Sequence, residues 1–165
     1  MKIAVVSDIH DQLDNLEWFL EEVKKRKVEM IFGLGDYSSL YVVERLLRAG
    51  KKTVLVKGNN DANLVGMKQA VDQVEGAEFS TDVFLEYELD GDLYFLTHFP
   101  LLAENAARSG KYKAVFYGHT HHQRKDVIGQ TVLVNPGKLA AYPEGSVSFI
   151  VFNPVDSLVE FVERS

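Results

Sequence analysis

The sequence predicts an α/β fold in which strands and helices alternate in the first half and strands dominate the second half. The first observation is the apolar run IAVV over residues 3–6, which is typical of a strand buried on both faces. The second is a set of apolar residues at helical spacing over residues 13–27, which predicts a helix covering that sheet. The third is Asp90-Gly91 between two apolar runs, a dipeptide that favours a hairpin turn.

The first half of the chain continues this alternation in order. Residues 30–32 form a short apolar run and predict a second strand, followed by a helix that reaches to about Ala49. Residues 53–56 predict a third buried strand, and the next helix is expected to run through residues 67–74. These alternating elements are typical of strands that lie parallel in one sheet.

Past Gly76 the expected elements are mostly strands. A short helix is expected over residues 100–109, with Gly110 as its stop. Apolar runs predict the strands, and the turn before the last strand is expected at residues 153–156. The expected strands cover residues 83–89, 93–96, 114–117, 132–134, 146–152 and 158–162.

Length and composition limit the function classes. A chain of 165 residues suits one domain, which we expect to cover residues 1–165. The absence of cysteine excludes disulfides, thiolate zinc sites and cysteine nucleophiles. The net charge of -6 argues against a surface for duplex nucleic acid. Because no apolar run is long enough to span a membrane and Met1-Lys2 lead directly into the first strand, we expect a cytoplasmic protein without a membrane partner.

Asp8 and His10 follow the first strand, at the edge where α/β sheets place their ligands. Residues two apart in an extended chain point to the same side, so this carboxylate and imidazole are expected to converge on a metal ion. Asp-x-His alone is a weak signal. The alternative is a structural Asp8 that caps the next helix.

The segment over residues 33–38 (GLGDYS) imitates a dinucleotide-binding fingerprint between a strand and a helix. A carboxylate at Asp36 would repel the pyrophosphate that such a motif binds at the helix start. As a metal ligand the same residue is well suited, because Gly35 allows close approach of the backbone and two carboxylate oxygens can bridge two cations. We therefore interpret Asp36 as a metal ligand.

A third polar block follows the strand at residues 53–56. Asn59 offers a neutral carbonyl oxygen to a metal, whereas Asp61 is expected to orient a neighbouring ligand. The alternative for this block, taken alone, is a Gly-Asn turn that opens the following helix.

Histidines change the balance between these interpretations. Every histidine of the chain lies just after a predicted strand, and three of them fall within four residues: His10, His98, His119, His121 and His122. Histidines of an ordinary core would be scattered, so metal binding is the better interpretation. His119 and His121 are expected to face the same side of an extended segment, with His122 facing away at the rim.

Together the polar blocks resemble a known family. They are Asp8-x-His10, Gly35-Asp36, Gly58-Asn59-Asn60-Asp61, Thr97-His98 and Gly118-His119-Thr120-His121. This order resembles the calcineurin-like metallophosphoesterase superfamily, and the small size and the turn Asn135-Pro136-Gly137 are similar to its short bacterial and archaeal phosphodiesterase branch. The resemblance implies a four-layer αββα sandwich of two mixed β-sheets flanked by helices, of α/β (α+β) class.

The resemblance also implies two metal sites that share a bridging Asp36. One ion would be held by Asp8, His10, Asp36 and His121, and the second by Asp36, Asn59, His98 and His119. Such oxygen and imidazole ligands favour Mn2+, with Fe, Zn, Ni or Co as alternatives. Two ions can supply a bridging hydroxide for attack on a phosphodiester. Catalytic roles are accordingly expected for Asp36, Asn59, Asp61 and His98.

Three departures from the family pattern concern the substrate. Asn60 stands where related phosphatases often have a histidine, and an amide cannot act as a general acid, so leaving groups of low pKa should be hydrolysed best. Phe99-Pro100 and Lys138 stand where the short branch usually has Gly and Ser, which alters the expected pocket wall. The candidates for substrate contact are Asn60, His122, Arg124 and Lys138.

The resemblance implies a metal-dependent phosphodiesterase for small phosphodiesters. It also makes a homodimer a candidate assembly, because small members of the family often form dimers. One alternative is a phosphomonoesterase or protein phosphatase, which Asn60 and the short chain disfavour. The other is a non-catalytic protein-binding scaffold like the retromer subunit of this fold. That subunit has a degraded metal site, whereas every ligand position is intact here.

Overall fold

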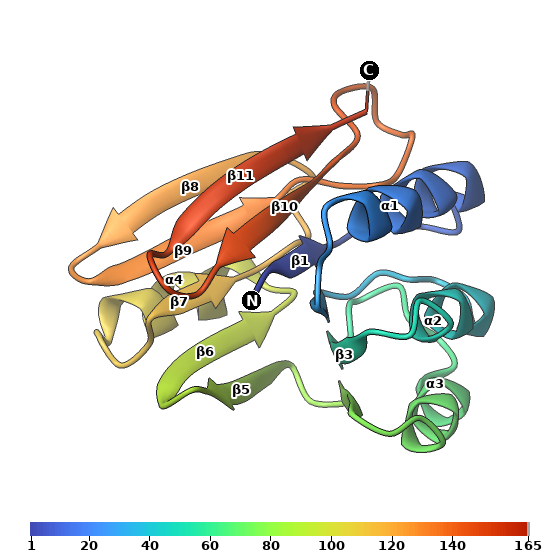
Figure 1. The fold of residues 1–165 in the computed structure, drawn as a ribbon, viewed down its shortest axis with the longest axis horizontal. Helices are drawn as coiled ribbons and strands as arrows, with labels where there is room; N and C mark the ends of the chain where they lie inside the picture. The colour runs from blue at the N-terminus through green and yellow to red at the C-terminus, as the bar shows by residue number, and fades with distance from the viewer. Residues whose placement is uncertain (165) are drawn as a thin grey trace.

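A computed structural model describes residues 1–164, which form two β-sheets with helices on their outer faces (Figure 1). Ser165, the last residue of the expected domain, lies outside the described residues. The first sheet has six strands in the order β11-β10-β1-β2-β3-β4. Its strands are β1 Ile3–Val6, β2 Met30–Gly33, β3 Lys52–Val56, β4 Ala77–Ser80, β10 Ser148–Asn153 and β11 Leu158–Glu163. Strands β1 to β4 are parallel, and β10 is antiparallel to both β1 and β11.

The second sheet has five strands in the order β5-β6-β7-β9-β8. Its strands are β5 Phe84–Leu89, β6 Asp92–Thr97, β7 Ala114–Phe116, β8 Gln123–Ile128 and β9 Thr131–Pro136. Strands β6, β7 and β9 are parallel, and an antiparallel strand lies at each edge. Asp90 and Gly91 both have positive φ angles, 53° and 83°, so the hairpin turn predicted between β5 and β6 is confirmed.

Four helices complete the layers, and they lie on opposite sides of the sheet pair in Figure 1. They are α1 Leu13–Lys25, α2 Leu40–Leu47, α3 Leu64–Asp72 and α4 Pro100–Arg108. The first three pack on the outer face of the first sheet, around residues such as Phe19 and Val43. Helix α4 packs on the outer face of the second sheet around Ala103 and Val115, and a third cluster around Phe32 fills the space between the sheets. The predicted four-layer sandwich is therefore confirmed.

Two strands, β4 and β8, have no counterpart among the expected elements. Both lie at a sheet edge, where only one side pairs with a neighbouring strand. Strand β8 has the sequence QRKDVI and alternates half-buried with exposed residues, and in β4 only Phe79 is buried. Neither strand contains the apolar run that buried strands need, so their existence depends on backbone pairing rather than on side-chain pattern.

Helix boundaries differ from the expectations by a few residues. Helix α3 begins at Leu64 rather than near Met67, because the Asn63 side chain accepts a hydrogen bond from the Gly66 N–H at 3.0 Å and caps it. Helix α1 ends at Lys25, two residues before the expected end at residue 27. Within residues 1–164, the helices are too short or too polar to cross a bilayer.

The parallel arrangement determines where the polar loops meet. Strands β1, β2 and β3 are parallel, so their carboxyl ends lie side by side at one end of the first sheet. The carboxyl ends of β6 and β7 likewise lie side by side in the second sheet. A hydrogen bond of 2.8 Å between His98 Nδ1, after β6, and the carbonyl of Leu34, after β2, joins the two edges. The loops that carry the candidate ligands are thereby brought to one place.

Candidate metal centre

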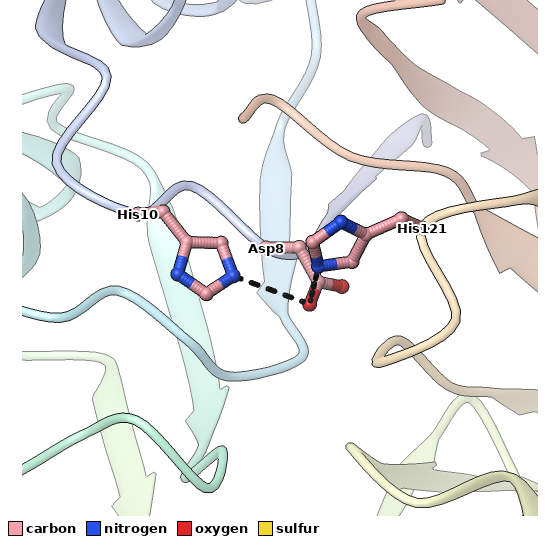
Figure 2. A group of neighbouring side chains, drawn as sticks. All are labelled: Asp8, His10 and His121. Atoms are coloured by element: carbon pink, nitrogen blue, oxygen red, sulfur yellow. Dashed lines mark ion pairs between the residues drawn. The ribbon is translucent and has the colours of Figure 1, made fainter. Parts of the chain in front are cut away.

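The first group of candidate ligands contains Asp8, His10 and His121 (Figure 2). Both imidazoles point their Nε2 atom at Asp8 Oδ1, at 3.7 Å for His10 and 3.1 Å for His121. Asp8 is fully buried, yet neither its Oδ1 nor the buried His10 Nε2 has a hydrogen-bond partner. Buried polar atoms without partners are costly, and a cation shared between Asp8 Oδ1 and His10 Nε2 would satisfy both.

The Asp8 carboxyl is held in its charged form. Burial acts to raise its pKa, but the contacts with His10 and His121 outweigh burial and keep the pKa well below its ordinary value. The backbone N–H of His119 also donates to Asp8 Oδ2 at 2.9 Å, which leaves Oδ1 facing the two imidazoles. The charged form is the one that binds a metal.

The loop after β1 brings Asp8 and His10 together by a route different from the expected one. Both residues have positive φ angles, 54° and 47°, so the segment is not extended, and the reason given from strand alternation was wrong. The loop is instead shaped by hydrogen bonds from the N–H of Ile9 and of His10 to the carbonyl of Asp36, each 3.0 Å. The alternative role for Asp8 is also wrong, since α1 begins after Gln12 and receives no side-chain cap.

The second group contains Asn59, His98 and His119. Asn59 Oδ1 lies 3.0 Å from His98 Nε2 and 2.8 Å from His119 Nδ1, and these two ring nitrogens are 3.2 Å apart. Because the carbonyl of Leu34 can only accept, His98 donates its Nδ1 proton there, so in the neutral ring Nε2 presents its lone pair to the group. His119 and His121 thus join different groups, and their positive φ angles of 71° and 61° show that the segment between them is not extended as expected.

Asp36 lies between the two groups. Its Oδ2 atom is 3.5 Å from His10 Nε2 in the first group and 3.4 Å from His98 Nε2 in the second. Ligand atoms that share one ion at about 2.1 Å lie about 3.0 to 3.4 Å from one another. The spacings in both groups are close to this range, so the residues present fit a pair of cations with one carboxylate between them.

Asn60 and Asp61 hold Asp36 in place. Asn60 donates its backbone N–H to Asp36 Oδ1 at 2.8 Å and its side-chain amide to Oδ2 at 2.7 Å. Asp61 accepts hydrogen bonds from the N–H groups of Asp36, Ser38 and Gly58, at 3.0, 2.9 and 2.7 Å. Burial raises the pKa of Asp61, and the three amide donors oppose that rise. Asp61 is therefore a positioning residue that ties the loop after β2 to the loop after β3.

Close packing of these two loops requires glycine. Gly35 has a φ of 94°, and a Cβ atom there would lie 2.4 Å from the nitrogen of Gly58. A Cβ atom on Gly58 would lie 2.1 Å from Asp36 Oδ1. The glycines of the GLGD and GNND segments thus permit the approach that places Asp36 between the groups.

Comparison with known proteins agrees with this geometry. The family model for the calcineurin-like phosphoesterase superfamily domain matches residues 1–157. The chain belongs to this superfamily. It is 31% identical to the phosphodiesterase MJ0936 of Methanocaldococcus jannaschii over 147 aligned residues. The aligned region covers 88% of each chain. The resemblance inferred from the sequence is therefore confirmed.

Solved structures of other proteins share the fold. A solved structure of an archaeal phosphodiesterase superimposes with a TM-score of 0.91 at 28% identity, over 99% of this chain and all of that one. The Escherichia coli phosphoesterase YfcE gives a TM-score of 0.66 at 23% identity, over 98% of each chain. Vacuolar Protein Sorting 29 of Cryptosporidium parvum gives 0.71 at 17% identity, over 99% of this chain and 97% of that one, which is a likeness of fold alone.

The residues expected to contact substrate in this phosphoesterase lie in different settings. His122 is exposed and directs Nδ1 at the carbonyl of Thr120, 2.5 Å away. Arg124 donates to Glu104 at 2.9 Å and to Asp126 at 2.6 Å, so its charge is already paired on β8 and it contacts none of the ligand candidates. Lys138 is buried and lines a hollow together with His121 and His122.

Two further residues of the site were missed in the sequence. Asn135 is buried, and its amide donates to the carbonyl of Gly118 at 2.8 Å and to the Thr120 hydroxyl at 3.0 Å, which holds the loop that carries His119 and His121. The available signals were its place directly after the apolar run at residues 132–134 and its membership of the Asn135-Pro136-Gly137 turn. Tyr142, with 83% of its side chain exposed, lines a second hollow beside His10 and His121. No local pattern indicates that position.

The affinity of this centre for Mn2+ is expected to rise with pH from about 5.5 to 7.5. Contact with Asp8 raises the pKa of His10, and Asp36 and Asp8 raise that of His98 despite its burial. An imidazolium cannot bind a cation, so protons compete with the metal until the pH exceeds these raised pKa values. Calorimetric titration in two buffers of different ionisation enthalpy measures both the affinity and the protons released. An affinity that stays constant over this range contradicts the assignment of the two histidines.

Proposed function

We propose that this calcineurin-like phosphoesterase is a metal-dependent phosphodiesterase that acts on small phosphodiesters. The observation that carries the proposal is the position of Asp36 Oδ2 between His10 and His98, with one ligand group on either side. The 31% identity to an archaeal phosphodiesterase supports the choice of a diester. We further propose that the whole chain acts as one domain in the cytoplasm.

Two bound divalent cations, for which we propose Mn2+, would lower the pKa of a water molecule and neutralise phosphoryl oxygens. Asp8, His10 and His121 would hold one ion, Asn59, His98 and His119 the other, and Asp36 both. The chain's own residues supply the geometry. Leu34 orients His98, Asn60 orients Asp36, and Asn135 holds the loop that carries His119 and His121.

The size and walls of the adjoining hollow support a small substrate. A hollow of about 370 Å³ lies beside His10 and His121 and is bounded by Tyr142 and Pro143. The exposed ring of Tyr142 offers an apolar surface to one ester arm, while the phosphoryl group would lie toward the imidazoles of His10 and His121. A hollow of this size suits the ester arm of a small molecule.

The test is hydrolysis of an aryl phosphodiester and the matching aryl monoester by metal-stripped protein, before and after addition of Mn2+. We expect Mn2+ to restore cleavage of the diester, with the monoester slower. Faster monoester cleavage would make the protein a phosphomonoesterase. Binding of two metal ions without turnover of either ester would favour the non-catalytic scaffold.

Replacing Asn60 with histidine is expected to raise kcat/KM for an alkyl phosphodiester at least about tenfold relative to an aryl one. Alkoxide leaving groups need a proton, which an amide cannot supply and an imidazolium can. The backbone N–H of residue 60 still bonds Asp36 Oδ1 in this variant. The measurement is the ratio of alkyl to aryl kcat/KM, with Asn60→Ala as the matched control that removes the amide without adding a donor. An unchanged ratio in Asn60→His shows that the absent general acid does not limit the alkyl ester.

A further inference from the structure

Lys138 is a buried cation without an ion pair. Its side chain is 2% exposed, and its ammonium donates one hydrogen bond, to the carbonyl of Pro143. Among residues 1–164 no carboxylate lies within ion-pair distance of it. Burial lowers the pKa of Lys138, while the more distant Asp8 carboxylate raises it. Keeping an ammonium in such a place is costly, and a packed apolar side chain would stabilise the fold better.

The lysine is joined to the metal centre by its own backbone. The N–H of Leu139 donates to the carbonyls of Ser7 and Asp8, each at 3.2 Å, and the N–H of Ala140 donates to Asp8 at 2.8 Å. Lys138 also lines a hollow of about 230 Å³ together with His121, a candidate ligand of the first group. Lys138 and one candidate ligand of the metal centre, His121, therefore line the same small space.

The other walls of this hollow leave the ammonium as the group suited to an anion. Gln123 is engaged with Glu163 through a 2.8 Å hydrogen bond, and His122 directs Nδ1 to the Thr120 carbonyl. Glu144 also lines the hollow but is exposed and forms no ion pair with Lys138. The ammonium has three N–H donors and the Pro143 carbonyl accepts from one of them, so an anion can accept hydrogen bonds from the other two or replace that carbonyl.

We propose that Lys138 is a specificity-determining residue that binds a second, compact anionic group of the substrate, a carboxylate or a phosphate on one ester arm. This inference rests on the proposed phosphodiesterase function. The scissile phosphoryl group lies at the metal centre, and the arm that carries the second anion occupies the hollow between His121 and Lys138. A charge-assisted hydrogen bond from the Lys138 ammonium favours such a substrate over an uncharged analogue.

The test compares two aryl phosphodiesters with the same leaving group, one with a 2-carboxyethyl arm and one with a propyl arm of similar size. For the Mn2+-loaded wild type we expect kcat/KM to be about tenfold higher with the carboxyethyl arm. Lys138→Gln keeps a side-chain donor for the Pro143 carbonyl but removes the charge, and is expected to bring this ratio to about one. Lys138→Arg is expected to retain a preference. Lys125→Gln, which removes a charge from the exposed face of β8, is the matched control and keeps the wild-type ratio.

The outcomes separate this inference from the proposed function. If the wild type cleaves both esters with equal kcat/KM, the phosphodiesterase stands and the anion site is wrong. If Lys138→Gln lowers kcat/KM for both esters by the same factor, Lys138 only tethers the segment at Pro143 and the inference is also wrong. If the wild type cleaves neither ester, the proposed function is wrong. In that case the anion site is tested by calorimetric binding of the corresponding phosphonates, in which a methylene replaces the scissile oxygen. Tighter binding of the carboxyethyl phosphonate than of the propyl one, lost in Lys138→Gln, supports the site, and equal affinities contradict it.

Discussion

Replacing Asp36 with asparagine is expected to remove one of two bound Mn2+ ions and to lower kcat/KM for an aryl phosphodiester at least about 10³-fold. The Asp36 side chain is 3% exposed, and its Oδ2 lies about equally far from His10 and His98, so its charge serves both groups of ligands. Asparagine has nearly the same size but a neutral oxygen and an amide that faces the imidazoles. Removing a bridging charge from this site costs several kcal/mol of stabilisation of the reacting phosphoryl group.

The measurement is metal stoichiometry by calorimetry together with steady-state kinetics. Asp14→Asn is the matched control, because it removes the same charge from the exposed surface of α1. It is expected to bind two ions and to retain wild-type kinetics. If Asp36→Asn binds two ions with normal affinity, Asp36 does not bridge and the arrangement of the centre must be revised.

Replacing Phe32 with alanine is expected to lower the free energy of unfolding by about 3 to 5 kcal/mol. Phe32 is fully buried between the two sheets, and its ring packs against Tyr87, Tyr94 and Phe116 at centroid distances of 5.5, 6.5 and 5.9 Å. Its removal leaves a cavity where the sheets meet. Because the chain from Phe32 leads to the Leu34 carbonyl that orients His98, metal affinity is expected to fall as well.

Urea unfolding of metal-free protein measures the stability change directly. Phe84→Ala is the matched control, since Phe84 is 42% exposed and, among the aromatic rings of residues 1–164, stacks on Phe95 alone at 5.1 Å, and its removal is expected to cost about 1 kcal/mol. An equal loss in the two variants would mean that the space between the sheets does not act as the main core of the sandwich.

Much of the fold could be predicted from the sequence because its signals are local. The apolar run at β1 and the Asp90-Gly91 turn depend on neighbouring residues only. The edge strand β8 could not be predicted, since its polar sequence becomes a strand only by pairing with β9. The strand propensity of an edge segment is weak, and backbone hydrogen bonds to the partner strand stabilise a strand that the side-chain pattern does not predict.

The residues of the candidate site were visible in the sequence, whereas their partners were not. Asp8 and His10 stand out because polar residues follow a buried strand, but the positive φ angles that bring them together arise from hydrogen bonds to the Asp36 carbonyl. Arg124 is an ordinary candidate for phosphate contact in the sequence. The structure pairs it with Glu104, 20 residues away in the chain.

The sequence by itself determined which side chains follow the strands, and hence the kind of chemistry that the edge of the sandwich can perform. The spacing of these residues did not decide how they are grouped; the family resemblance implied a grouping, and the tertiary structure brings it about through contacts between loops. His119 and His121 are two residues apart, yet one lies against Asn59 and the other against Asp8. Lys138 is noted in the sequence as a candidate for substrate contact, but nothing there shows that it is buried, and it is buried because the chain after it is bound to the carbonyl of Asp8. The reason is that local patterns follow from the few residues around each position, whereas a binding site is made by contacts between segments that are distant along the chain.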